Sequence, residues 1–326
     1  MKQHYVPRCY LRRFTDNKKC IFAYDKLNSK QYRTSLMSVC CENDMYTISD
    51  EYVKECKVYG DKGVDNLYIE HDYFAKDVEP LLLKCLQEIE EIKDEWITNK
   101  EHYKLTFSEK KELAYHIVTM YFRHPLIKQS EVDNYLRMEM AGIDMVKEAM
   151  AIKTGNEEFR NLKIGLKCER PALHAKLTYM NPKIMNDFAE TIATNIYIFR
   201  ICKRNDFYTS DFPIVVSPHV QNVQSNYMGL AQYGGEVTFP LSPNLLLSIY
   251  DRAYFSDIRM LDCCFVEATE KEIRRQNYLR YMYANRHVFS YKNDFRLIDF
   301  VFHHDSKHTF LKPNLKAEIV SGLGRY

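Results

Sequence analysis

Long apolar runs are missing from this sequence of 326 residues. No stretch approaches the roughly eighteen consecutive apolar residues of a membrane-spanning helix, so we expect no membrane segment. The N-terminus has neither the apolar core nor the small-residue cleavage site of a secretory signal, which predicts a cytoplasmic protein. The formal net charge is only +2, so the chain as a whole lacks the positive charge typical of nucleic-acid-binding proteins.

Several motifs of metal, nucleotide and hydrolase sites are also missing. The ten cysteines include no C-x-x-C, which argues against a zinc ribbon or finger, and in a cytoplasmic chain of this length we expect reduced, mostly buried thiols. There is no P-loop and no Rossmann glycine fingerprint. The C-terminal cluster His303, His304, Asp305 and His308 lacks another well-spaced ligand and is interpreted as part of a solvated tail. We therefore predict no metal site, and the sequence does not indicate a cofactor.

The apolar periodicity predicts an α+β fold. Residues 1–60 have the pattern of short strands and turns, including a hairpin around Asn28 and Ser29. Residues 66–200 are mainly helical, 197–291 contain strands plus one helix, and 300–326 form a tail. Because no linker or repeat interrupts the chain, we predict a single domain over 1–326, in which a helical middle separates terminal segments that contribute strands to one mixed or antiparallel sheet.

Helix boundaries are the sharpest local signals. Thr106 and Glu109 have the spacing of a capping box, and the helix that they begin should end before Pro125. Another helix is expected over about 130–152. Asn181 followed by proline predicts a further helix start. An amphipathic helix over 67–96 is expected to kink at Pro80.

The opening stretch HYVPRCYLRRF fits neither regular pattern. As a strand it has no cleanly apolar face, and Pro7 is excluded from a central ladder position. As a helix after Pro7 it has no continuous apolar stripe. A segment that concentrates histidine and arginine without a packing pattern is either a structural or loose terminus or part of a site.

Four short segments carry a resemblance to a known family. HYVPRCYLRRF, RHP after a helix, TSDFP and FPLSP resemble, in order and spacing, the boxes of a bacterial family of unknown function numbered 4238, over residues 4 to about 290. The resemblance implies family positions and no reaction, together with a role in conflict with phage or mobile elements. The implied positions are His4, Tyr5, Pro7, Tyr10, Leu11, Phe14, Arg123, Pro125, Ser210, Asp211, Pro213, Pro240, Ser242, Pro243 and Asn277. Met120 and Tyr121 depart from the family, whose members often have a polar residue before the arginine.

These positions suggest a site for phosphate chemistry. His4 can exchange a proton near neutral pH, and Asp211 can orient it or act as the acid or base. Arg8 and Arg123 can hold a phosphate through forked donors. We therefore predict His4, Arg8, Arg123 and Asp211 as catalytic residues of a nuclease or phosphoesterase. The predicted substrate-binding residues are Tyr5, Tyr10, Ser210, Ser242 and Asn277.

Two other interpretations stay open. The same residues could form a binding or sensing module for nucleic acid or a phosphate-bearing ligand, without turnover. They could also be structural: T-S-D-x-P as a capped turn, and Arg123 as a helix-end arginine that holds carbonyl groups. Ser242 lies in P-L-S-P rather than in a G-x-S-x-G elbow, which gives little support to a serine hydrolase.

Overall fold

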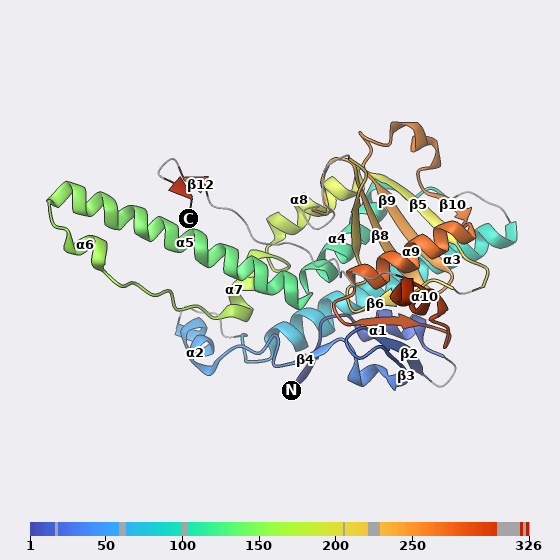
Figure 1. Ribbon diagram of the computed structural model, residues 1–326, viewed down its shortest axis with the longest axis horizontal. Helices are drawn as coiled ribbons and strands as arrows, with labels where there is room; N and C mark the ends of the chain where they lie inside the picture. The colour runs from blue at the N-terminus through green and yellow to red at the C-terminus, as the bar shows by residue number, and fades with distance from the viewer. Residues whose placement is uncertain are drawn as a thin grey trace.

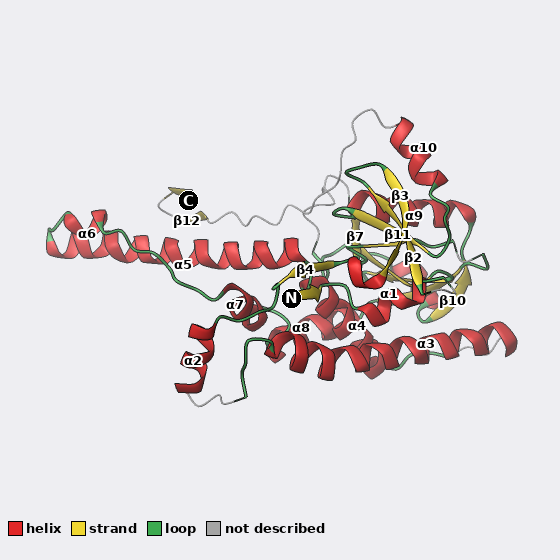
Figure 2. Cartoon of the chain, turned by 90° about the horizontal axis from the view of Figure 1, so that it is seen from below, coloured by secondary structure: helices red, strands yellow, loops and turns green. Residues whose placement is uncertain are grey.

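The computed structural model describes residues 1–16, 19–58, 63–99, 103–204, 206–220 and 229–304, together with the short strands β12 (Val320–Ser321) and β13 (Gly324–Arg325). The side chains of the C-terminal histidine cluster fall outside these residues. The predicted α+β class is confirmed: a body rich in strands adjoins a helical part from which one long helix projects (Figures 1 and 2). Within the described ranges, none of the helices has the length and apolar character that spanning a bilayer requires.

The opening stretch combines a short strand with a turn of helix. β1 (Lys2–His4) pairs antiparallel with β4 (Cys41–Asn43). Pro7 precedes α1 (Arg8–Leu11), and a 3₁₀ turn (Arg12–Phe14) continues it. Since the chain changes conformation at Pro7, neither a strand period nor a helix period could describe the whole stretch. Tyr10, Leu11 and Phe14 are fully buried, so the segment is part of the core.

An N-terminal hairpin meets strands from the C-terminal third of the chain in a four-stranded sheet of order β3-β2-β11-β6. Its strands are β2 (Cys20–Asp25), β3 (Lys30–Ser35), β6 (Thr209–Ser210) and β11 (His287–Ser290). The predicted hairpin is therefore present, and Ser29 in its turn has a left-handed φ of 50°. β11 pairs antiparallel with both β2 and β6, which joins terminal segments as the sequence predicts.

A second, five-stranded sheet has the order β10-β5-β9-β8-β7, so the strands do not all lie in one sheet. Its strands are β5 (Ile196–Ile201), β7 (Val215–Pro218), β8 (Gly235–Ser242), β9 (Leu245–Tyr250) and β10 (Cys264–Glu267). β10 pairs parallel with β5, and the other pairs are antiparallel.

The two faces of this sheet differ in chemistry because side chains alternate along each strand. One face carries Val237, Phe239 and Leu247, which belong to the main apolar cluster together with residues of the helical part. On the other face the register aligns Ser217 with Glu236 and Thr238 with Ser248. Helix α9 (Glu270–Tyr283) crosses this polar face (Figure 1).

Two helices begin where the sequence predicts, whereas the helix expected over about 130–152 begins earlier, at Pro125. α4 (Phe107–Phe122) begins with the Thr106–Glu109 capping box and ends before Pro125. α8 (Pro182–Ala193) is capped by Asn181. Instead of a kink at Pro80, a π-helical segment, η3 (Ile69–Val78), leads into α3 (Glu79–Asn99). The remaining helices are α2 (Asp50–Val58), α5 (Pro125–Thr154), α6 (Glu158–Asn161), α7 (Arg170–Leu177) and α10 (Arg296–His304).

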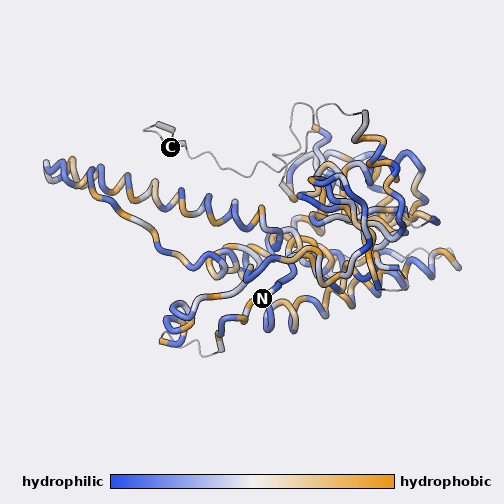
Figure 3. Tube along the Cα trace, turned by 60° about the horizontal axis from the view of Figure 1, so that its bottom comes forward, coloured by the Kyte–Doolittle hydropathy of each residue, from blue (hydrophilic) through white to orange (hydrophobic). Residues whose placement is uncertain are grey.

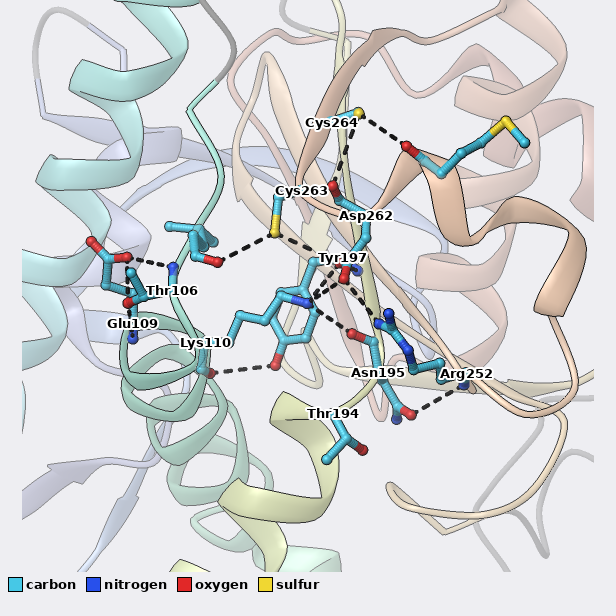
Figure 4. A network of polar contacts seen from close by, with 12 residues as sticks. Thr106, Glu109, Lys110, Thr194, Asn195, Tyr197, Arg252, Asp262, Cys263 and Cys264 are labelled. Carbon is cyan, nitrogen blue, oxygen red and sulfur yellow. Dashed lines mark hydrogen bonds and ion pairs between the residues drawn. The ribbon is translucent and has the colours of Figure 1, made fainter.

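A buried ion pair fixes α4 against the edge of the five-stranded sheet (Figure 4). Lys110 Nζ lies 2.6 and 2.8 Å from the two carboxylate oxygens of Asp262, and it also donates to the carbonyl of Asn195 at 3.0 Å. The same carboxylate accepts from the Tyr197 backbone N–H and from Arg252, both at 3.0 Å. The ten cysteines are free; four are buried and six half-buried, so they are less buried than the sequence predicts.

Candidate functional site

Arg123 joins the N-terminal box to the helical part. Its buried guanidinium donates from Nη2 to the backbone carbonyl of His4 at 2.7 Å and from Nη1 to Glu79 Oε1 at 3.0 Å. The guanidinium carbon lies 3.8 Å from the centroid of the Phe74 ring. Burial alone would lower the pKa of Arg123, but Tyr46 and the nearby carboxylate of Glu79 outweigh it and raise the pKa. The geometry matches the structural alternative of an arginine that holds a carbonyl at a helix end.

His4 and Arg8 lie in different surroundings. His4 is buried, and its Nε2 is 3.2 Å from the carbonyl oxygen of Leu36. Burial lowers the pKa of His4, with the Leu36 carbonyl opposing the shift. Arg8 is exposed, and its Nη1 lies 2.7 Å from Met37 Sδ. The charge of Arg8 also lowers the pKa of His4, so the guanidinium lies near the imidazole, although the hydrogen bonds of the two side chains go to different partners.

Asp211 closes the turn between α9 and β11. Its buried carboxylate accepts from the backbone N–H groups of Asn285, Arg286 and His287 at 2.7 to 2.8 Å. Burial raises the pKa of Asp211 to about 6, although the three N–H groups oppose the rise. The ring nitrogen Nδ1 of His287 is 4.0 Å from this carboxylate, whereas no hydrogen bond or ion pair links Asp211 to His4.

The predicted binding residues contact other parts of the protein chain: the two serines bond residues two positions away, whereas Asn277 and Tyr5 contact distant segments. Asn277 accepts from the Tyr208 N–H at 2.9 Å and donates to the Asp206 carbonyl at 2.8 Å. The Ser210 hydroxyl lies 2.8 Å from the carbonyl of Phe212, and Ser242 donates to Asn244 at 2.6 Å. The Tyr5 ring is buried edge-on against His124. These contacts order turns and helix positions.

Tyr10 is the one predicted residue at which three family boxes meet. Its buried hydroxyl donates to the carbonyl of Pro240 at 2.8 Å and lies 2.6 Å from Thr209 Oγ1. Tyr10 comes from the first box, Thr209 from TSDFP and Pro240 from FPLSP. The ring stacks on Phe239, with centroids 5.0 Å apart. Three of the four boxes therefore converge at Tyr10, which packs in the main apolar cluster and whose hydroxyl lies near the charge of Arg280.

Arg280 of α9 lies in this region and was not singled out in the sequence. It is 0% exposed, and its Nη2 donates to Thr238 Oγ1 at 2.6 Å. Its Nε and Nη1 have no hydrogen-bond partner among the described residues. Burial lowers the pKa of Arg280 to about 9, while Tyr10 and Glu236 oppose the fall. Arg280 in this state destabilises the fold, because a buried charge is tolerated only where hydrogen-bond partners or an opposite charge satisfy it.

Other unpartnered polar atoms lie around Arg280. The hydroxyls of Ser217 and Ser248 and the Oε1 of Gln276 are also buried without a partner in the described structure. We call the interface between the polar face of the sheet and α9 the polar layer; its residues are Ser217, Glu236, Thr238, Ser248, Gln276 and Arg280. Three kinds of unused group, guanidinium, hydroxyl and amide carbonyl, are thus gathered in one layer.

The polar layer meets solvent at the Glu236 end. Glu236 is fully buried, and its carboxylate lies 2.9 Å from His219 Nε2, 2.5 Å from Arg275 Nη2 and 3.0 Å from the Tyr250 hydroxyl. Burial alone would raise the pKa of Glu236, but His219 and Arg275 lower it to about 2. The side chains of His219 and Arg275 are 33% and 42% exposed, so this end is accessible.

The layer combines anion recognition with a histidine that is held in place. Glu236 and Thr238 are two residues apart on β8, so the two ends of the layer are about 7 Å apart along the strand. Arg280 and the serine hydroxyls are donors for an oxyanion, and His219 is a candidate proton carrier oriented by a carboxylate. Among the described residues, no group of three or more His, Cys, Asp or Glu side chains is arranged to hold a metal ion.

The sequence did not reveal this layer because its buried residues are polar, whereas a buried face is normally recognised by its apolar residues. In α9, Gln276 and Arg280 are spaced four apart and define a buried face, where a stripe of apolar residues is the usual indicator. In β8, Glu236 and Thr238 alternate with apolar residues, which predicts a strand with one wet face. The clue available in the sequence is a strand with one polar face that is followed by a basic helix.

Comparison with known proteins gives a family and no closer relative. A family model described as "Protein of unknown function (DUF4238)" matches residues 2–294 of the chain. Neither the curated proteins nor the solved structures contain a match.

Proposed function

The chain belongs to the DUF4238 family, and because the family model names no activity, we propose a function from the geometry: the protein binds a phosphate-bearing ligand in the polar layer, with Arg280 as the anion anchor. The observation that carries the proposal is a fully buried guanidinium with two nitrogens that have no partner in the described structure. An oxyanion provides the acceptors that Arg280 lacks, and it neutralises the buried charge.

The neighbouring groups favour phosphate among oxyanions. Phosphate has several acceptor oxygens in a tetrahedral arrangement, and the layer holds unused donors on three residues, Arg280, Ser217 and Ser248. Arg275 adds a second guanidinium at the solvent end. The unused Gln276 Oε1 is an acceptor, which suits a hydroxyl on the organic part of a phosphate ester.

The test is a binding titration with inorganic phosphate and with nucleoside monophosphates, followed by calorimetry. Wild type is compared with Arg280→Met, which removes the anchor, and with Arg8→Met, which removes an exposed guanidinium outside the layer. We expect at least a tenfold weaker affinity for Arg280→Met and no change for Arg8→Met. Equal binding by wild type and Arg280→Met, or no binding by wild type at millimolar ligand, contradicts the proposal.

A second candidate function is hydrolysis of a phosphate ester, and the His219–Glu236 pair favours it. The pair places an imidazole next to a buried carboxylate at the accessible end of the layer. In such a reaction the water oxygen bonds to phosphorus while His219 accepts its proton, the P–O bond to the leaving group breaks, and the protonated His219 then gives that proton to the leaving oxygen. Arg280 and Arg275 would stabilise charge on the phosphoryl oxygens.

The hydrolysis test uses RNA, single-stranded DNA, plasmid and bis(p-nitrophenyl) phosphate, each with Mg²⁺ or with EDTA. His219→Asn is expected to lose activity while it stays folded. His4→Ala and Asp211→Ala test the residues that the sequence predicts as catalytic, and circular dichroism separates lost activity from lost folding. If His4→Ala and Asp211→Ala stay folded and inactive while His219→Asn is active, the site lies at the residues that the sequence predicts as catalytic.

The predicted role in defence is tested by plaque counts on cells that express wild type or Arg280→Met.

A further inference from the structure

Helix α5 projects from the body of the protein (Figures 1 and 2). Its 30 residues give it a length of about 45 Å. Ala151, near its far end, is buried, and Gly155 ends the helix in a left-handed conformation with φ of 69°. Apolar residues recur along the projecting helix (Figure 3). Because this helix projects from the core, its apolar side chains are exposed to water unless another surface covers them.

One face of α5 is apolar and exposed. Met138, Met145, Val146 and Ile152 each leave between 49% and 70% of their surface uncovered. At 100° per residue, these four side chains fall within one sector of the helix, centred on Gly142. A Cβ atom added to Gly142 would meet nothing within 4 Å, so the centre of the sector faces open space.

The spacing on this face is that of a helix-pairing seam. Tyr135, Met138, Gly142, Met145, Ala149 and Ile152 follow each other at intervals of three and four residues. This is the a/d pattern of a coiled coil, sustained over more than two heptads. The small residues at positions 142 and 149 allow a second helix to approach closely. We call this set of six residues the α5 seam.

We propose that the α5 seam binds the α5 seam of a second copy of this chain, in an antiparallel homodimer whose two-fold axis passes between Gly142 and Met145. Closed two-fold pairing is the commonest assembly of soluble homo-oligomers and requires a self-complementary surface. The six seam residues are spaced symmetrically about this point, so each meets a seam residue of the partner subunit and the surface is self-complementary.

The exposed apolar area is sufficient for a stable pair. From their exposed fractions, Met138, Met145, Val146, Met150 and Ile152 leave on the order of 500 Å² uncovered. A standard interface buries about 800 Å² per partner and is roughly 60% apolar, which is also about 500 Å². The same area is near the upper limit of apolar patches on monomers. A second copy accounts for it without another protein.

The experiment is sedimentation velocity of the full-length chain at about 1–50 μM, a concentration range that spans the dissociation constant of a moderately stable dimer. We expect a dimer for wild type, a monomer for the double variant Met145→Glu/Val146→Glu, and an unchanged dimer for Met260→Glu, a matched change at an exposed methionine outside α5. Circular dichroism checks that each variant is folded. A monomeric wild type, or a double variant that still dimerises through this range, overturns the proposal.

Three cysteine variants test the orientation. An equimolar mixture of the Gly142→Cys and Met145→Cys variants should form a disulfide between copies under mild oxidation, because the antiparallel pair sets these two positions opposite each other. Met138→Cys alone should not, because an antiparallel pair separates the two copies of residue 138. The reverse result excludes the antiparallel pair.

Discussion

Replacing Arg280 by methionine should make the unliganded protein more stable. Burial lowers the pKa of this guanidinium to about 9, well below the usual value for arginine. Since one pKa unit corresponds to about 1.4 kcal/mol, keeping the group charged at pH 7.5 costs the folded state on the order of 5 kcal/mol. Methionine removes this cost and loses the hydrogen bond to Thr238, worth roughly 2 kcal/mol. Allowing for imperfect packing, we expect the free energy of unfolding to rise by about 2 kcal/mol.

The matched control is Arg275→Met, the same change five residues away. Arg275 is the guanidinium that pairs with the buried carboxylate of Glu236, so its removal leaves that charge with only the hydrogen bonds to His219, Tyr250 and Gln276. Because the Arg275 side chain is 42% exposed, we expect a loss of about 2 kcal/mol, below the full cost of breaking a buried pair. Both variants are measured by urea unfolding at pH 7.5, with circular dichroism and Trp96 fluorescence as probes. A drop of more than about 1 kcal/mol for Arg280→Met would refute the reasoning, because Arg280 would then stabilise the fold.

Two further predictions concern buried titratable groups. Burial lowers the pKa of His116 to about 4 and those of His124 and His174 to about 3, so the unfolded chain binds more protons below pH 6.5 and stability is lost as the pH falls. Between pH 7.5 and 5.5 the three histidines lower the free energy of unfolding by about 4 kcal/mol, and the raised pKa of Asp211, about 6, offsets roughly 1 kcal/mol of this loss. An unchanged urea midpoint over this pH range would be inconsistent with neutral buried imidazoles. Asp211→Asn should lower the free energy of unfolding at pH 7.5 by about 2–3 kcal/mol, because one amide oxygen cannot replace a carboxylate that accepts from three N–H groups. Urea unfolding of that variant checks it, and a loss below about 0.5 kcal/mol would show that the turn does not depend on the carboxylate.

The sequence predicted the elements that depend on local signals. The capping box at Thr106 and the Asn181 cap each need only a few neighbouring residues, and both are present. The opening box has two conformations, a strand before Pro7 and a helical turn after it, so no single period in the sequence could describe it. The partners of Asp211 and Arg123 were not predictable, since they come from segments far away in the chain.

Arg280 shows why the candidate site lay beyond the sequence. In the segment EIRRQNYLRYMY, three arginines have similar neighbours. Arg274 is exposed and pairs with Glu270, Arg275 is half-exposed on Glu236, and Arg280 is fully buried. Only the packing of α9 on the polar face of β8 distinguishes them. A buried polar helix face has no apolar periodicity to reveal it.

The most direct test of the account is a crystal structure of the wild-type protein grown with inorganic phosphate or adenosine monophosphate. The account predicts tetrahedral density in the polar layer, with phosphate oxygens about 3 Å from Nε and Nη1 of Arg280. Density for ordered water alone at these two nitrogens, at saturating ligand, would contradict the central claim and identify Arg280 as a hydrated structural residue.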